Sequence, residues 1–507
     1  MVLSHRSSAA ALAFVCLAYV GIRIFRLTDS CLWFDEIFSI HAAEQPWSSI
    51  LSFVALDLIH PPLFYVLLKI WTGLGGESLF WLRLFPVVFA VIAIFPFLAL
   101  CRELKLSFWT QIVALFFFAV NGSLIKYAQE VRMYAPMLCF SLFSIWLFSR
   151  YLNRGKGFIA LLLINVLLVY THYFGWLVLG AELATMLCVQ RSRWRGVVTM
   201  VGGVFVCFLP WAIAVLRAAG GGSGLEQNIG WMTRPGVRGV SQFVLNLVEP
   251  FYYQASSADP ISIFKMSVPI FMIAAAAGVL YFARRNTHAE DERNTIKYLS
   301  VVSILPLSAA FAVSWLLPYS IWGSRHLIIV FAPLSILFAI AITKIPRVAV
   351  QTAAVAFLLL FTGYALVMHL TRVTPHYIWC AWNDVAPAFI KKSGSDEPKI
   401  YVFEDLVAYH LWFALRNERN AQVVRVLGTG VSNDAAYFLP RGFDGVTKIA
   451  DSEIVGEHVT IAFRSSEFAA TEPPVSNLVS KGYKIIETVP FPVGRSTAYL
   501  CRLKLDK

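Results

Sequence analysis

The segment HPPLFYVLLKIWTGLG, at residues 60–75, decides the topology of this chain, because whether it crosses a membrane sets the side of every later loop. Its apolar run is short, contains Lys69 and follows two prolines, which suit the first turn of a helix. Short apolar segments of this kind are more often interfacial or re-entrant than membrane-spanning. We therefore predict an interfacial helix here.

Eleven further apolar stretches have about the length that crosses a bilayer as a helix. Hydrophobic residues make up 58% of the 507-residue chain and charged residues 14%, whereas a soluble domain contains roughly 25% charged residues. The composition therefore predicts an α-helical polytopic membrane protein. The predicted spans are residues 8–27, 80–100, 107–125, 133–149, 157–171, 174–190, 196–217, 263–283, 298–317, 327–343 and 348–370.

Positive charge sets the predicted orientation. With residues 60–75 left out of the count of spans, the loops CRELK, SRYLNRGKG, RSRWR, ARRNTHAEDERNTIK and KIPR fall on the side of the N-terminus and contain fourteen Lys and Arg. Lys and Arg collect in cytoplasmic loops, so this side is predicted to be the cytoplasm. The net charge of +12 is explained by topology and does not indicate nucleic-acid binding.

The hydropathy falls after residue 370, which predicts a membrane domain at 1–370 and a small extracytoplasmic α/β domain at 371–507. In the second domain, WNDVAPAFIKKS and VAYHLWFALRN have helical spacing, whereas KIYVF and VTIAF are typical of short buried strands. The domain is long enough to bury its own core. Cys380 and Cys501 bracket it and could form a disulfide in an oxidising compartment.

Two adjacent carboxylates, Asp35 and Glu36, follow the first span in the stretch LWFDEIFSIHAA. They could cap the helix that begins there and interact with its dipole. A carboxylate at the lipid boundary could also act as a general base on an acceptor hydroxyl, since apolar neighbours raise its pKa. An ion path is a third interpretation. The pair alone leaves all three open.

The stretch KYAQEVRMYAP places Glu130 and Arg132 between two spans, with Tyr127 and Tyr134 on either side. An ion pair within an aromatic belt would explain this stretch without any site. Charged and imidazole groups recur, however, in the other outer loops, at His60, His172, Arg325 and His326. If the spans form a bundle, these loops meet in one outer cavity that can hold an anion beside a hydroxyl.

Arginine is the residue best suited to a lipid-linked phosphate, because its planar guanidinium binds phosphate oxygens in pairs and stays charged. Arg132 and Arg325 are the candidates for this role. Arg23 and Arg26 also lie on the outer side and are expected to extend toward lipid headgroups instead.

Five motifs in order, WFDE, HPPL, YAQEVRMYA, THYF and SRHLIIVFAPL, resemble glycosyltransferase family 39. This family includes the protein O-mannosyltransferases, is related to the bacterial aminoarabinose transferase that acts on lipid A, and has the GT-C architecture. The resemblance covers residues 1–345, about two thirds of the chain. The β-trefoil domain that protein O-mannosyltransferases often carry has no counterpart between these spans.

The resemblance implies that a sugar carried on polyprenyl phosphate is transferred with inversion to an acceptor at the outer face of the membrane. Asp35 matches the acid that serves as catalytic base, with Glu36 supporting it. The implied contacts of the donor phosphate are Arg325 and Arg132, with Tyr134 and His326 beside them.

Placement of the acceptor or of a metal is implied for Glu130, His60 and His172. In the aminoarabinose branch a Lys stands at the position of His60 and a Glu precedes it. Here Ile59 precedes His60, so the acidic ligand of that branch is absent. No cofactor is assigned, and a divalent metal remains an open alternative.

The sequence therefore predicts a mannosyltransferase-like GT-C enzyme of the bacterial inner membrane that acts on cell-envelope glycans. Its N-terminus is expected in the cytoplasm, with the site and the C-terminal domain outside. The expected partners are a polyprenyl-phosphate-linked sugar, a lipid, glycan or protein acceptor, and membrane lipids, with no nucleic acid. The interfacial helix and the loop 218–262, with its GGGSG stretch at 220–224, are expected to gate entry of the lipid.

Two other classes remain as alternatives. An oligosaccharide ligase or polymerase would share the outer cavity and use a diphosphate-linked donor. A transporter of lipid-linked saccharides would require ionisable residues within the spans and two related halves. The spans contain few such residues, of which Glu182 is one, and no internal repeat is visible.

Overall fold

The computed structural model describes residues 5–188, 193–219, 230, 232–251, 264–282, 290–371, 377–393, 398–418, 420–431, 445–494 and 496–506. The chain divides into two compact units. The first contains the described residues of 1–27, 46–253 and 261–372, and the second contains those of 28–45 and 373–507. The GGGSG stretch at 220–224, which is part of the expected gate for the lipid, lies outside the described residues.

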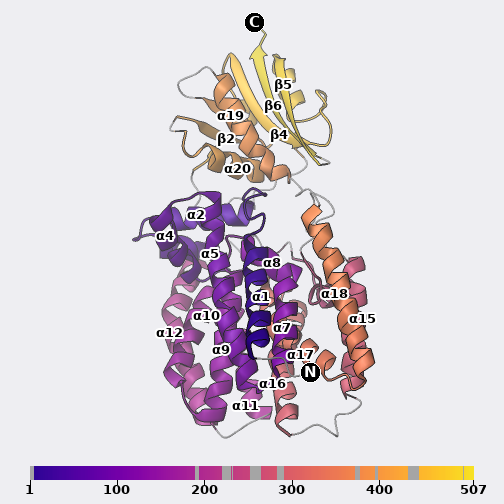
Figure 1. Cartoon of the computed structure of the whole chain (residues 1–507). Helices are drawn as coiled ribbons and strands as arrows, with labels where there is room; N and C mark the ends of the chain where they lie inside the picture. The colour runs from indigo at the N-terminus through magenta and orange to yellow at the C-terminus, as the bar shows by residue number, and fades with distance from the viewer. Residues whose placement is uncertain are drawn as a thin grey trace. The chain divides into compact units, whose positions relative to one another are not determined.

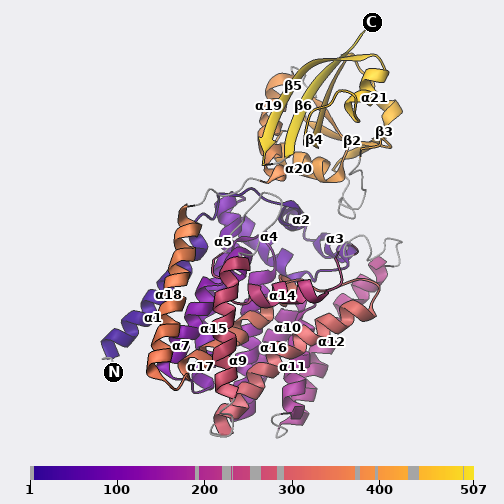
Figure 2. The ribbon, with the colours of Figure 1, turned by 90° about the vertical axis from the view of Figure 1, so that its right-hand side faces the viewer.

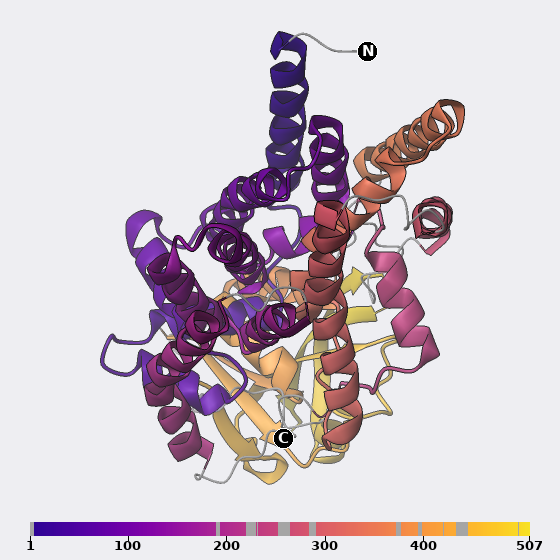
Figure 3. The ribbon, with the colours of Figure 1, turned by 90° about the horizontal axis from the view of Figure 1, so that it is seen from below.

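The first unit is a bundle of helices (Figure 1). Its elements are α1 (His5–Ile24), α3 (Ile50–Asp57), α4 (Leu63–Gly75), α5 (Leu79–Ile92), α6 (Ile94–Glu103), α7 (Phe108–Val120), α8 (Gly122–Gln129), α9 (Tyr134–Arg154), α10 (Phe158–Thr171), α11 (Gly175–Cys188), α12 (Trp194–Ala219), α14 (Val237–Asn246), α15 (Phe264–Phe282), α16 (Glu290–Leu316), η2 (His326–Val330), α17 (Phe331–Thr343) and α18 (Val348–Thr371). Seen along the bundle, α1 and α18 lie at its edge (Figure 3).

Six stretches of the described chain are long and apolar enough to cross a membrane, namely Leu79–Glu103, Tyr134–Arg154, Trp194–Ala219, Glu290–Leu316, His326–Thr343 and Val348–Thr371. Shorter apolar helices occupy the other five predicted spans, at Ser8–Ile24, Phe108–Val120, Phe158–Thr171, Gly175–Cys188 and Val268–Val279. The predicted polytopic fold is confirmed. The segment predicted as an interfacial helix forms α4, which begins directly after Pro62; its depth in the bilayer stays a prediction.

The span predicted at 107–125 is interrupted at Asn121, which separates α7 from α8. The Asn121 side chain accepts a hydrogen bond from the amide of Leu124 at 3.0 Å and so caps α8. Its amide group donates to the carbonyls of Asn246 and Leu247, at 3.0 and 3.1 Å. This break starts the short helix that leads to Glu130 and the candidate site.

Arg23 does not extend to the headgroups, and that expectation is wrong, because its side chain is fully buried. Its guanidinium lies 3.3 Å from the ring centroid of Tyr19. It donates to the carbonyls of Phe118 and Ala119, at 3.3 and 3.2 Å. These carbonyls end α7 and have no partner within that helix, so Arg23 joins α1 to α7 as a structural residue.

The second unit is an α/β domain together with an earlier helix of the chain. Its elements are α2 (Phe34–Glu44), η3 (Ile378–Ala381), α19 (Trp382–Ser393), β1 (Lys399–Val402), α20 (Asp405–Leu415), β2 (Gln422–Leu427), β3 (Thr447–Ala450), η5 (Asp451–Glu453), β4 (His458–Ser465), α21 (Val475–Ser480), β5 (Tyr483–Val493) and β6 (Ser496–Leu505). The six-stranded sheet has the order β3-β2-β1-β4-β6-β5. The four predicted elements of this domain are confirmed as α19, β1, α20 and β4.

After the exposed Lys399, the stretch KIYVF is apolar at every position, because both faces of the sheet are covered. Ile400 and Val402 belong to the core formed with α19 and α20, whereas Tyr401 and Phe403 belong to the core that includes α21. The helices α19 and α21 lie on opposite sides of the sheet (Figure 2). β1 pairs parallel with β2 and β4, and β2 pairs parallel with β3. β6 pairs antiparallel with β4 and β5.

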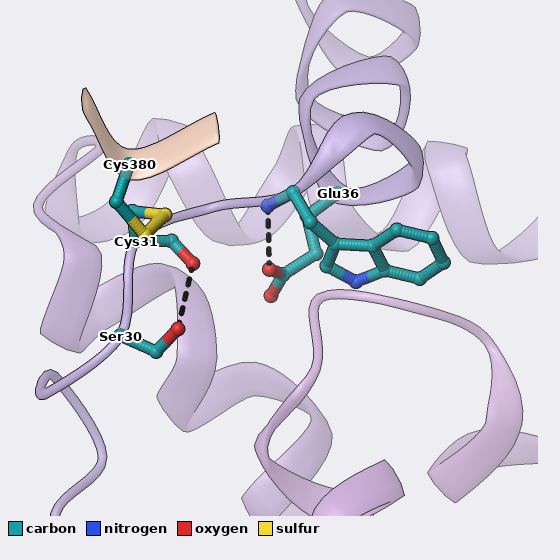
Figure 4. Close-up of a disulfide and its surroundings, with 5 residues drawn as sticks. Ser30, Cys31, Glu36 and Cys380 are labelled. Atoms are coloured by element: carbon teal, nitrogen blue, oxygen red, sulfur yellow. Dashed lines mark hydrogen bonds between the residues drawn. A yellow bond between two sulfur atoms is a disulfide. The ribbon is translucent and has the colours of Figure 1, made fainter. Parts of the chain in front are cut away.

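A disulfide joins Cys380 to Cys31, 349 residues earlier in the chain (Figure 4). The suggested Cys380–Cys501 pair is therefore wrong. Cys501 lies in β6 on the core face shared with α21, whereas Ala381 and Trp382, which follow Cys380, belong to the core on the opposite face. A disulfide across the sheet would have to pass through its backbone, so Cys501 stays a buried thiol.

Candidate active site

The best-defined polar cluster of the first unit begins where α3 ends. Leu58 adopts a left-handed conformation (φ 63°) directly after Asp57 and ends the helix. Pro61 and Pro62 follow His60 and directly precede α4, which begins at Leu63. This tight turn holds Asp57 Oδ2 2.5 Å from Nδ1 of His60. The contact fixes the tautomer, because an imidazole N–H that donates to a carboxylate leaves the other ring nitrogen as an acceptor.

The other ring nitrogen of His60 faces an arginine. His60 Nε2 lies 3.1 Å from Nη2 of Arg132, so the guanidinium donates to it. Both side chains are buried. The three residues therefore form a relay, Asp57–His60–Arg132, in which the carboxylate orients a neutral imidazole and the imidazole orients the guanidinium.

Arg132 and Glu130 lie in the short link between α8 and α9, as the stretch KYAQEVRMY predicts. The backbone N–H of Arg132 donates to the carbonyl of Glu130 at 2.6 Å. The Glu130 carboxylate lies 3.7 Å from Nζ of Lys126, one helical turn earlier. The Tyr127 hydroxyl is 3.3 Å from Oγ of Ser324, and burial together with Glu130 raises the pKa of Tyr127 to about 12, so it stays protonated.

Imidazole and aromatic rings from two further outer segments, around His172 and around His326, lie beside His60 and Tyr134. The ring centroids of His60 and His172 are 5.9 Å apart, and those of His172 and His326 are 5.4 Å apart. His326 also lies 5.2 Å from Phe174 and 6.3 Å from Tyr134. The structure thus brings together residues of four predicted outer segments within one unit.

His172 is held neutral. Burial lowers its pKa well below the ordinary value, and electrostatic interactions with His326, His60, Arg132 and Arg325 lower the pKa of this imidazole further. The His172 Nδ1 accepts a hydrogen bond from the amide of Phe174 at 3.1 Å, so the proton of the neutral ring is on Nε2. The cluster as a whole holds two guanidinium groups among neutral imidazoles, an environment that favours an anion.

Asp35 and Glu36 lie in the first turn of α2, in the second unit. The Glu36 side chain is fully buried and its Oε2 accepts from the backbone N–H of Trp33 at 3.2 Å (Figure 4). The helix-cap interpretation is therefore confirmed for Glu36. Asp35 is partly buried, and its carbonyl accepts from Oγ of Ser39 at 2.9 Å. A catalytic role of the Asp35 carboxylate stays a prediction.

The expectation that no acidic side chain lies beside His60 rests on Ile59 at the preceding position, and it is wrong. The acid comes instead from Asp57, three residues before His60 and across a helix end. The signal was the spacing D-x-x-H followed by Pro-Pro, which forces a turn. Among the described residues, no group of three or more His, Cys, Asp or Glu side chains is arranged to hold a metal ion.

The intramembrane carboxylate, Glu182, has a different environment. Its Oε1 lies 2.5 Å from Oγ of Ser144, that hydroxyl lies 2.6 Å from Oδ1 of Asn165, and Nδ2 of Asn165 lies 3.1 Å from Oε2 of Glu182. The single hydroxyl proton of Ser144 cannot serve both acceptors. The ring closes when Glu182 is protonated and donates to Ser144, which in turn donates to Asn165. This neutral ring joins α9, α10 and α11.

Solved structures with similar folds are membrane glycosyltransferases. ArnT from Cupriavidus metallidurans in the apo state superposes with a TM-score of 0.61 at 14% identity, over 97% of this chain and 98% of that one. The same protein bound to undecaprenyl phosphate gives 0.57 at 13% identity, over 98% of each chain. The Archaeoglobus fulgidus oligosaccharyltransferase in complex with Zn and sulfate gives 0.50 at 15% identity, over 80% of this chain and 61% of that one.

No protein-family model matches this sequence, and neither does any curated protein. At identities this low, structural similarity establishes the fold and leaves donor, acceptor and residue roles to other arguments. The expectation of a GT-C fold, which came from five short motifs, agrees with the superpositions over nearly the whole chain. The chain is therefore a multi-pass membrane protein with the GT-C fold.

Proposed function

We propose that this chain is an inverting glycosyltransferase that moves one sugar from a polyprenyl-phosphate donor to an acceptor hydroxyl at the outer face of a bacterial cytoplasmic membrane. The observation that carries the proposal is the Asp57–His60–Arg132 relay with the neutral His172 beside it. A relay of this kind presents a fixed positive charge to an anion. The fold is shared with ArnT, which has been crystallised with undecaprenyl phosphate.

The donor phosphate is the leaving group of the reaction, so its negative charge increases as the bond to the sugar breaks. Arg132 stabilises that charge with its guanidinium, and its orientation by His60 avoids a reorganisation during the step. Arg325 supplies a second guanidinium to the same cluster, since its charge acts on His172. The proton on Nε2 makes His172 a further donor, and Tyr134 and His326 complete the ring-lined side of the phosphate site.

The acceptor hydroxyl needs a base, and Asp35 is proposed for this role. In the transfer step, the hydroxyl oxygen attacks the anomeric carbon, its proton passes to Asp35, and the bonding electrons leave with the polyprenyl phosphate. Attack from the face opposite the phosphate inverts the anomeric configuration. Glu36 keeps the N-terminus of α2 in place through its bond to the Trp33 amide, and Glu130 is proposed to orient the acceptor.

The disulfide supports the proposed orientation in the membrane. Cys31 and Cys380 both lie in segments that the charge of the loops assigns to the outer side, and disulfides persist in oxidising compartments. The domains are proposed as 1–370 for catalysis in the membrane and 371–507 outside it. Residues 28–45 nevertheless pack with the second domain.

The proposal is tested with the purified chain in proteoliposomes. Radiolabelled undecaprenyl-phosphate monosaccharides are supplied one at a time, together with envelope lipids and glycans of a bacterium as acceptors. One of them should yield labelled acceptor and free undecaprenyl phosphate in equal amounts, with an inverted anomeric centre. Absence of transfer from every monophosphate donor, with transfer from a diphosphate-linked oligosaccharide, would establish the ligase or polymerase alternative instead.

The transporter alternative is less well supported. The sequence places few ionisable residues within the spans, and one of them, Glu182, is hydrogen-bonded to the neutral side chains of Ser144 and Asn165. A reconstituted chain that moves an intact lipid-linked sugar across the bilayer without cleaving it would favour transport.

A further inference from the structure

We propose that the C-terminal domain is the positioning element for the acidic helix α2, and that the Cys31–Cys380 disulfide and the α2–α20 contact are needed to hold Asp35 for transfer. The inference rests on the proposed function of Asp35. It assigns a task to residues 377–506, which lie more than 300 positions from the acid in sequence and share a compact unit with it.

The covalent connection lies immediately before the acid. Cys31 precedes Asp35 by four residues, and its disulfide partner Cys380 lies in η3, directly before the buried helix α19 (Figure 4). Trp382, the first residue of α19, is among the most buried side chains of the domain core. The disulfide thus joins the segment before α2 to residues that directly precede the buried Trp382 of the domain core.

The body of α2 packs along α20. The ring of Phe34 lies 5.1 Å from that of Tyr409, and the hydroxyl of Tyr409 lies 3.3 Å from Nδ1 of His41. His41 also lies 4.8 Å from the ring of Trp412. Contacts therefore run from the first residue of α2 to its last turn, on both sides of Asp35.

The C-terminal end of α2 is held as well. The Glu44 carboxylate lies 3.7 Å from Nε of Arg416, the residue that follows α20, and both side chains are partly buried. An isolated helix of 11 residues is unstable in water and depends on packing for its stability. Since α20 and η3 supply that packing at both ends, the direction of the Asp35 carboxylate is set by the C-terminal domain.

The consequence for catalysis is quantitative. Misplacement of a reacting group by about 1 Å costs on the order of 100-fold in rate. Loosening α2 should therefore lower kcat while leaving the donor KM unchanged, because the phosphate-binding cluster belongs to the other unit. A merely stabilising disulfide would change thermal stability without this separation of kcat from KM.

The experiment uses the full-length chain in proteoliposomes and compares the double variant Cys31→Ser/Cys380→Ser with the wild type. Amide hydrogen exchange should rise in residues 34–44, and kcat should fall about 10- to 100-fold at an unchanged donor KM. Reduction of the wild type by dithiothreitol should reproduce both effects. Unchanged exchange in α2 together with unchanged kcat would overturn the proposal.

Two further variants keep the test specific. Cys188→Ser/Cys207→Ser removes two exposed thiols of the helical unit and should behave as the wild type, including its loss of activity on reduction. Tyr409→Phe removes only the hydroxyl that contacts His41 and should lower kcat about 2- to 10-fold, as expected for one hydrogen bond. Tyr409→Phe with wild-type kcat and wild-type exchange in α2 would show that the α2–α20 contact does not position the acid.

Failure of this inference is distinguishable from failure of the proposed function. If Asp35→Asn abolishes transfer while Cys31→Ser/Cys380→Ser retains full kcat, the function stands and the positioning role is wrong. If Asp35→Asn retains transfer, the catalytic assignment itself is wrong, whatever the disulfide variants do.

Discussion

Two carboxylates of the helical unit, the fully buried Glu182 and the partly buried Asp57, are held in opposite ways. Glu182 closes a ring with Ser144 and Asn165 in which each proton serves one acceptor and no charge remains. Asp57 starts a relay through His60 to Arg132, with a charged group at each end. Burial of a carboxylate therefore does not by itself indicate a functional role in this bundle. We use instead whether its hydrogen-bond network keeps a charged group.

The comparison predicts opposite responses to the same chemical change, replacement of a carboxylate by its amide. The ring around Glu182 needs one donor and one acceptor, which an amide supplies. The relay from Asp57 needs a charged carboxylate that only accepts a hydrogen bond from His60, whereas an amide is neutral and can also donate. The predictions below apply this difference to Asp35, Asp57 and Glu182 and add the buried His410. The effects on transfer and donor binding come first and the effects on stability follow, each from the larger to the smaller.

The largest effect is expected for Asp35→Asn. Without the carboxylate no base takes the acceptor proton, and general-base catalysis contributes about 10²- to 10⁴-fold. We expect kcat to fall by that factor with unchanged affinity for undecaprenyl phosphate, measured by transfer assay and by native mass spectrometry in nanodiscs. Transfer at the wild-type rate would remove Asp35 from the mechanism.

The second effect is expected for Asp57→Asn. An amide can present its oxygen or its nitrogen to His60 Nδ1, and the second arrangement places the His60 proton on Nε2, facing the Arg132 donor. The guanidinium would then lose its orientation, and affinity for undecaprenyl phosphate should fall about 10-fold, the cost of one charge-assisted hydrogen bond. Asp57→Glu should retain more affinity than Asp57→Asn; equal affinity of Asp57→Asn and the wild type contradicts the relay.

The third prediction concerns His410, an imidazole kept neutral mainly by burial, in contrast to His172, which also lies near cations. Burial lowers the pKa of His410 in α20 to about 4, and its Nδ1 lies 2.9 Å from the carbonyl of Leu406. Below the ordinary pKa of about 6.5, His410 is protonated in the unfolded state but stays neutral in the native state. The free energy of unfolding therefore falls as the pH falls. Between pH 7.5 and pH 5 this one group should cost about 2 kcal/mol.

The measurement is the pH dependence of hydrogen exchange in strands β1 and β4 of the full-length chain. His410→Asn keeps a donor near Leu406 and should flatten the dependence over this pH range. His458→Asn, at an exposed position that begins β4, is the matched control and should not. An unchanged slope in His410→Asn would show that another group controls the acid sensitivity.

The smallest effect is expected for Glu182→Gln. The amide donates to Ser144 and accepts from Asn165, so the free energy of unfolding should change by less than about 0.5 kcal/mol, with transfer intact. Glu182→Ala leaves Ser144 and Asn165 buried without their partners and should cost about 1–3 kcal/mol, measured as thermal stability in detergent. A Glu182→Gln chain that is stable but inactive would give this carboxylate a chemical role.

The hydropathy pattern was sufficient to locate the helices of the helical unit, because a bilayer requires apolar helices: six predicted spans coincide with long apolar helices and the other five with shorter ones among the described residues. It could not locate the interruption between α7 and α8 at Asn121. Hydropathy is averaged over a window of many residues, so one Asn-Gly pair within an apolar stretch changes the average little. The strands of the α/β domain were predicted from the runs KIYVF and VTIAF, in which four of five residues are apolar because both faces of the sheet are covered.

The site was predicted in part. His60, Arg132, His172 and His326 meet as the loop charges suggested, because short loops at one end of a helical bundle lie close together. Asp57 was missed because its contact depends on a left-handed turn at Leu58. The partner of Cys380 was wrong because sequence spacing carries no information about which face of a sheet a residue occupies.

The central claim is that Arg132, oriented through His60 by Asp57, binds the phosphate of the lipid donor. It is tested most directly by the affinity of the reconstituted chain for undecaprenyl phosphate in Arg132→Gln, with the exposed Arg102→Gln as matched control. We predict at least about a 10-fold loss for Arg132→Gln and none for Arg102→Gln. Wild-type affinity in Arg132→Gln, with the fold intact, would contradict the account.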